Sequence, residues 1–156
     1  MRKSNAYRSS NDKEKQKLKI FLPAIQKAAI FYDDSFMNKR IVYYTKYRSI
    51  ELTSIKSNFM HLCGVNYRWG AHRFFDDILS HRLKLDDISI KNDGTTYQKL
   101  RVIDNLPELL SKHVRLVTSG KFLFLKYDYA LRTSKQILAL TLVSNKNSFL
   151  FFRNHY

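Results

Sequence analysis

The spacing of apolar residues changes along this chain from a helical period to the alternation typical of strands, and this change restricts the fold class more than any single motif does. Asn11 and Glu14 form the pattern of a capping box at the start of a helix. The apolar residues that follow have i, i+3, i+4, i+7 spacing and are Leu18, Phe21, Leu22, Ile25, Ala28, Ala29 and Tyr32. This spacing predicts an amphipathic helix of about 20 residues.

Further elements are predicted on both sides of this change. Helical spacing marks residues 70–82 and one turn at 85–88. A third helix is capped by Thr95 or Thr96, and Pro107 bends or restarts it near Asp104 and Asn105. Strand composition marks a first group at 40–48, 49–55 and 58–64, and a second at 115–119, 122–128, 129–133, 137–144 and 149–153, with a turn at Ser119-Gly120. We therefore expect an α+β fold on an antiparallel sheet, with a flexible basic arm at 1–10 and a single domain at 11–156.

The charge of the chain favours nucleic acid as its partner. Lys and Arg number 28 against 13 Asp and Glu, which gives a net charge of +15. Phosphate backbones are the common partner of such domains, although positive charge also serves solubility alone. The basic residues are dispersed and no long apolar run occurs, so we expect no membrane association. Because Cys63 is the one cysteine, we expect no disulfide and a cytoplasmic setting.

His61 is the main candidate for chemistry. It lies in Asn58-Phe-Met-His-Leu-Cys-Gly64, before a predicted glycine turn, and a histidine titrates near neutral pH. It is also readily interpreted as a core or edge-strand histidine. None of the five histidines pairs at i, i+4 and no phosphate-binding glycine motif occurs, so we expect neither a metal nor a cofactor. RNA cleavage through the ribose 2′-hydroxyl needs only a base, an acid and groups that stabilise the phosphate, and the segments 126–129 and 132–135 supply such groups.

Short motifs in a characteristic order resemble a known family. They are Phe59-Met-His-Leu-Cys-Gly-Val65, then Phe74-Phe75 through Leu83, Leu85 and Ile88, then Asp93-Gly-Thr-Thr96 with Lys99-Leu100 and the 106–110 leucine run. This order is similar to the phage-borne BECR nucleases (barnase, EndoU, colicin and RelE-like), fourth phage subgroup, over about residues 13–143. The resemblance implies an α+β fold with a four-stranded antiparallel sheet and a metal-independent ribonuclease activity.

The resemblance also implies roles for individual residues. The family histidine corresponds to His61, which we expect to be the general acid or base. Lys126, Arg132 and Thr133 are the nearest equivalents of the later polar positions. Lys126 and Arg132 would stabilise the transition state, and Thr133 or Tyr127 would assist by hydrogen bonds. Cys63 stands where threonine is usual, which matters if that hydroxyl holds a phosphate. Basic and aromatic residues predicted to bind nucleic acid, with RNA favoured over DNA, are Lys56, Tyr67, Arg68, Arg73, Tyr127 and Lys135.

Two functions that do not involve catalysis remain open at this point. In the first, the chain is a basic phage protein that binds nucleic acid or a host nucleoprotein complex, as an inhibitor of CRISPR-type bacterial defence does. In the second, its positive surface binds an acidic protein partner. The sequence does not predict an oligomeric state.

Overall fold

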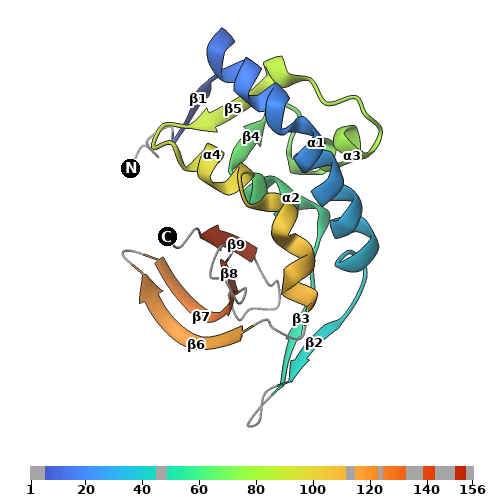
Figure 1. Cartoon of the computed structure of the whole chain (residues 1–156), viewed down its shortest axis with the longest axis vertical. Helices are drawn as coiled ribbons and strands as arrows, with labels where there is room; N and C mark the ends of the chain where they lie inside the picture. The colour runs from blue at the N-terminus through green and yellow to red at the C-terminus, as the bar shows by residue number, and fades with distance from the viewer. Residues whose placement is uncertain are drawn as a thin grey trace.

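The computed structural model describes residues 6–44, 49–111, 115–122, 125–132, 139–142 and 150–153, and for the strands after residue 114 it defines the backbone and its register. Two of the predicted site residues, Thr133 and Lys135, lie outside these residues, as does the start of the predicted arm, 1–5. The architecture is α+β, as predicted, with helices beside small antiparallel sheets (Figure 1).

Helix α1 (Asp12–Ser35) confirms the prediction from helical spacing and is slightly longer than expected, at 24 residues. Its capping box is complete: the Asn11 side chain accepts from the Glu14 amide at 2.9 Å, and the Glu14 carboxylate accepts from the Asn11 amide at 3.1 Å. Both interactions satisfy amides that the first turn of a helix otherwise leaves unpaired. The helix buries one face against the rest of the molecule and leaves the opposite face to solvent.

A three-stranded sheet packs beside α1 in the order β1-β5-β4, with both pairings antiparallel. Its strands are β1 (Tyr7–Ser9), β4 (Val65–Tyr67) and β5 (Ile88–Lys91). Residues 7–9 were predicted to belong to a flexible arm, but they pair with β5. Arg8 adds two hydrogen bonds to the Glu14 carboxylate, at 2.7 and 2.6 Å, which tie β1 to the start of α1.

Helix α2 (Lys56–Cys63) corrects the prediction of a strand over 58–64. Its side chains at Asn58, Phe59, Met60, Leu62 and Cys63 are all buried, so the helix is covered on more than one side. The helix has only eight residues, and its spacing of Phe59, Leu62 and Cys63 at i, i+3 and i+4 extends over too few positions to be distinguished from a short strand. Gly64 ends the helix in the left-handed conformation, at φ 68°.

The remaining elements of the first two thirds agree more closely with the prediction. The β2–β3 hairpin, helix α3 and the single turn η1 lie inside the expected ranges, and the predicted helix after Thr95 is present but divided. It separates into α4 and a 3-10 helix, η2, at Arg101 and Val102, two residues before the bend expected near Asp104 and Asn105. The bounds are β2 (Ile41–Tyr44), β3 (Ser49–Leu52), α3 (Ala71–Leu79), η1 (Leu85–Asp87), α4 (Thr95–Leu100) and η2 (Ile103–Leu110).

The C-terminal strands form a four-stranded antiparallel sheet in the order β6-β7-β8-β9. Its strands are β6 (Arg115–Phe122), β7 (Leu125–Arg132), β8 (Ala139–Leu142) and β9 (Leu150–Arg153). The turn predicted at Ser119-Gly120 is wrong, because β6 continues through Gly120, which pairs with Tyr127. Likewise the two strands predicted on either side of residue 128 are one strand, β7.

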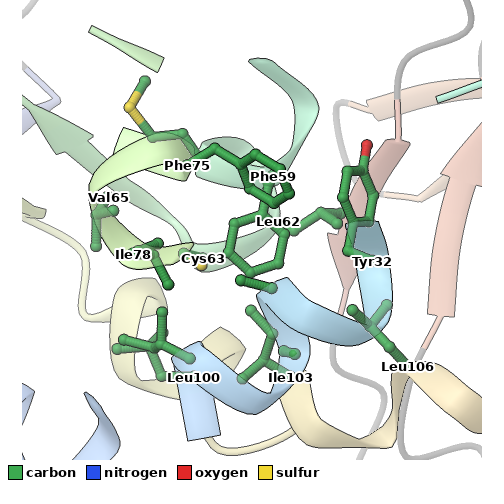
Figure 2. Close-up of a cluster of buried hydrophobic side chains, with 14 of the residues drawn as sticks. Tyr32, Phe59, Leu62, Cys63, Val65, Phe75, Ile78, Leu100, Ile103 and Leu106 are labelled. Atoms are coloured by element: carbon green, nitrogen blue, oxygen red, sulfur yellow. The ribbon is translucent and has the colours of Figure 1, made fainter. Parts of the chain in front are cut away.

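The core lies where α1, α2, α3, α4 and η2 meet, and aromatic side chains fill much of it (Figure 2). Tyr32 packs against Phe59 and Phe75 with ring centroids 5.4 and 5.7 Å apart. Helix α2 passes through the middle of the molecule and also contacts β9, so it joins the helical part to the four-stranded sheet (Figure 1). In the described part of the chain, no helix has the length and apolar character needed to span a membrane.

Candidate active site

His61 lies on the last turn of α2, and its side chain is exposed although both of its chain neighbours, Met60 and Leu62, are buried. The prediction that it lies on a strand is wrong, but its accessible position is compatible with a catalytic role. The tight turn after the helix fixes its backbone, because the Gly64 amide donates to the His61 carbonyl at 3.1 Å. His61 is therefore presented to solvent from a rigid, buried helix.

Lys99 of α4 lies over this end of α2. Its Nζ donates to the His61 carbonyl at 3.3 Å, which places a cation at a helix C-terminus, where the helix dipole favours positive charge. Its aliphatic stem passes directly over Gly64: a Cβ atom there would lie 2.7 Å from Lys99 Cδ. The backbone angle thus favours glycine at position 64, and a larger residue there would also shift the Lys99 side chain.

A buried threonine joins the three elements around His61. The Thr96 Oγ1 donates to the Gly64 carbonyl at 2.6 Å and accepts from the Lys91 amide at 2.9 Å. One hydroxyl thereby connects the end of α2, the first turn of α4 and the end of β5. This connection fixes the backbone of Lys91, the second cation that acts on His61.

The surroundings lower the pKa of His61 below its usual value of 6.5, first through partial desolvation and then through the charges of Lys99 and Lys91. A positive charge nearby disfavours the imidazolium form, so the surroundings favour the neutral ring. A neutral imidazole accepts a proton, which is the role of a general base. The same two lysines provide positive charge for an anion bound beside the ring.

Cys63 is fully buried among apolar side chains and does not reach this surface (Figure 2). Burial raises the pKa of its thiol far above the usual range, so the thiol stays protonated. A threonine at this position would also lie in the core rather than against a ligand. The difference between cysteine and threonine therefore concerns packing, and it is no argument against catalysis.

The other predicted contacts in the first two thirds of the chain lie away from His61. Lys56, on the first turn of α2, pairs with Asp76 at 2.7 Å, and Arg73 pairs with Asp77 at 2.8 Å. Tyr67 is the last residue of β4, and Arg68 follows it directly. Tyr67 is 2% exposed and its hydroxyl donates to Asp77 at 2.8 Å, so its ring is not accessible for stacking on a base, and we leave it out of the interface.

Strand β7 is one of the two inner strands of the four-stranded sheet, and it carries Lys126, Tyr127 and Arg132. Lys126 is paired in register with Lys121 of β6. Arg132 is opposite Arg115 on one side and Ala139 on the other, and Ala139 is opposite Arg153 of β9. Residues opposite one another share a face of the sheet, so Arg115, Arg132 and Arg153 occupy positions on one face. Arg153 is on β9, the strand that α2 contacts.

Sequence reasoning missed Lys91 and Lys99 as parts of the site. They flank the Asp93-Gly94-Thr95-Thr96 motif, which itself contributed to the family resemblance, but no local pattern shows that this motif folds against the end of α2. The described parts of the chain hold no group of three or more His, Cys, Asp or Glu side chains placed to bind a metal.

Comparison with known proteins supports the family that the motif order suggested. No curated protein and no solved structure gives a significant match. A family model does match residues 24–155, which is most of the chain, and its description is phage-Barnase-EndoU-ColicinE5/D-RelE like nuclease4. The chain therefore belongs to this family of phage BECR-like nucleases, PBECR4.

Proposed function

We propose that the protein is a metal-independent endoribonuclease that cleaves RNA by transesterification. The ribose 2′-oxygen forms a bond to the adjacent phosphorus, and the bond from phosphorus to the 5′-oxygen breaks. A base takes the 2′-hydroxyl proton, and the departing 5′-oxygen takes a proton from water or an acid. The products are a 2′,3′-cyclic phosphate and a free 5′-hydroxyl. Membership of a nuclease family supports action on nucleic acid, and the choice of RNA is our proposal.

The observation that carries this proposal is the exposed His61 ring beside two lysines that lower its pKa. A general base needs to be unprotonated at the working pH, and the two lysines and partial desolvation provide this. When a phosphate binds, its negative charge offsets the lysines. The pKa of His61 then rises, which makes the ring a better proton acceptor when the substrate is in place.

Lys99 and Lys91 are our candidates for stabilising the charge that develops on the phosphate oxygens. Lys126 and Arg132 lie further off, since β7 is two strands away from β9, or about 10 Å at the usual strand spacing. We therefore propose that these two bind phosphates next to the one that reacts. We also propose that Tyr127 and Thr133 donate hydrogen bonds to the phosphate backbone of the RNA.

The test is incubation of the purified protein with RNA, and with DNA of the same sequence, in the presence of a chelator. We expect cleavage of RNA alone, and we expect His61→Ala to remove it while the far-UV circular dichroism stays unchanged. His81→Asn is the matched control, because His81 is also exposed and contacts Gln26 rather than the site. Asparagine tolerates the positive φ of 58° at that position.

Two results would reject the proposal: no RNA cleavage by the wild-type protein, or equal cleavage by His61→Ala. RNA binding without cleavage would support the non-catalytic alternative, a phage protein that binds nucleic acid or a host nucleoprotein complex.

A further inference from the structure

A second surface with the chemistry of nucleic-acid recognition lies at the opposite end of β4 from His61. Strand β4 begins directly after Gly64 and ends directly before Arg68 and Trp69, and its three residues span about 10 Å. Trp69 is 57% exposed, which is unusual for the largest apolar side chain. Its position follows from the turn that connects β4 to α3, in which the Gly70 amide donates to the Tyr67 carbonyl at 3.0 Å.

The exposed ring is held in one orientation. The Trp69 indole N–H donates to an Asp87 carboxylate oxygen at 3.0 Å, and the Arg68 guanidinium lies over the ring, 5.1 Å from its centroid. The Arg68 guanidinium also lies 4.0 Å from the Asp87 carboxylate, and the Arg68 amide donates a hydrogen bond to the Asp87 carbonyl at 2.9 Å. A ring fixed in this way loses little conformational entropy when a ligand stacks on it.

Two exposed arginines lie within four residues of Trp69 in the chain. Arg68 is 70% exposed and Arg73, on the first turn of α3, is 64% exposed. Arg73 is paired with Asp77, on which the charge of Arg82 also acts. An exposed aromatic ring among arginines suits a single-stranded nucleic acid, because the ring stacks on a base and the arginines bind its phosphates.

We propose that Trp69, with Arg68 and Arg73, forms a binding site for a single-stranded segment of RNA, separate from His61. An acidic protein would use the arginines but would not need the flat face of a fixed indole ring. The inference shares with the proposed function the choice of RNA as ligand. It does not require cleavage, so the two fail in distinguishable ways.

The chain contains one tryptophan, so its fluorescence reports on Trp69 directly. The experiment titrates the full-length His61→Ala protein, which leaves RNA intact, with a single-stranded RNA oligonucleotide under tryptophan-selective excitation. We expect saturable quenching of the emission by the single strand and much weaker quenching by a duplex of the same sequence, whose bases are already stacked. For variants of Trp69, which lack the tryptophan fluorophore, the affinity is measured with labelled RNA instead.

Trp69→Ala is expected to weaken binding of the single strand about tenfold, and Trp69→Phe to restore most of the loss, since stacking needs a ring but not the indole N–H. Tyr44→Ala is the matched control, because Tyr44 is exposed on β2 and belongs to another surface; it should change the affinity less than twofold. RNA binding that leaves the emission unchanged would overturn the inference, as would equal quenching by the duplex. So would a Trp69→Ala protein that binds as tightly as its parent.

Discussion

At the scale of single residues, the account depends on the proton equilibrium of His61. The charges of Lys99 and Lys91 disfavour the imidazolium form and so lower the pKa of the ring. Protonated histidine cannot act as a base, so cleavage by the free enzyme is expected to decline below that lowered pKa. The stability of the fold depends on pH in the same direction. Because the pKa of His61 is lower in the folded protein than in the unfolded chain, its contribution to stability is present above pH 6.5 and is lost as the pH falls through the lowered pKa.

Lys99→Met tests this coupling, because methionine keeps an aliphatic stem over Gly64 and removes the charge. The pKa of His61 should rise, so the acid limb of the profile of kcat/KM against pH should move to higher pH. The plateau rate should fall by about 10²-fold through the loss of a cation at the phosphate. Lys27→Met, at an exposed position on α1, is the control. An acid limb that does not move, or that moves to lower pH, would contradict the assignment.

Gly64 and Gly94 form a matched pair of left-handed glycines, with φ of 68° and 79°. Alanine costs about 1–2 kcal/mol in this conformation, so Gly94→Ala should lower the free energy of unfolding by about that amount and Gly64→Ala by at least as much. At Gly64 the new methyl group would also displace Lys99, whereas at Gly94 no atom lies within 4 Å. Denaturant unfolding and single-turnover cleavage together separate the effects: Gly64→Ala should slow cleavage and Gly94→Ala should not. Equal slowing by both would show that the path of Lys99 is irrelevant.

At the scale of elements, the capping box of α1 supports both the helix and strand β1. Asn11→Ala removes the acceptor for the Glu14 amide and should lower the free energy of unfolding by about 1 kcal/mol. Asn11→Ser retains a capping oxygen and should recover most of that loss. Urea denaturation monitored by circular dichroism measures both variants. If the alanine variant were as stable as wild type, the cap would not contribute to the fold.

The sequence predicts α1 well because the helix has one buried face, one exposed face and a local cap, so its signals lie within neighbouring residues. It predicts α2 wrongly because that helix is short and buried on several sides, so its few apolar residues do not distinguish a helical period from a buried strand. The signals that would have identified it are Gly64 as a left-handed helix end and the Asn58 side chain, which accepts from the Ile55 amide at 3.1 Å. Strand boundaries in the C-terminal sheet were misplaced because Gly120, although it is typical of turns, occupies a strand position.

At the scale of the whole molecule, the candidate site is an assembly of segments far apart in the sequence. His61 and Lys99 are 38 residues apart and meet because α4 packs against the end of α2. Composition predicted a nucleic-acid partner and the motif order predicted the family, but neither contains the packing that brings Lys91 and Lys99 to His61. The four-stranded sheet joins this assembly through the contact of β9 with α2 (Figure 1).

The central claim is that His61 removes the proton from a ribose 2′-hydroxyl. Its most direct test is the single-turnover cleavage of an RNA, in chelator, before and after the ribose at the mapped cleavage site is replaced by 2′-deoxyribose. We expect the all-ribose RNA to be cut, the substituted RNA to remain intact at that site, and His61→Ala to lower the rate on the all-ribose RNA by about 10²–10⁴-fold. Cleavage at the deoxy position, or wild-type rates from His61→Ala, would contradict the account.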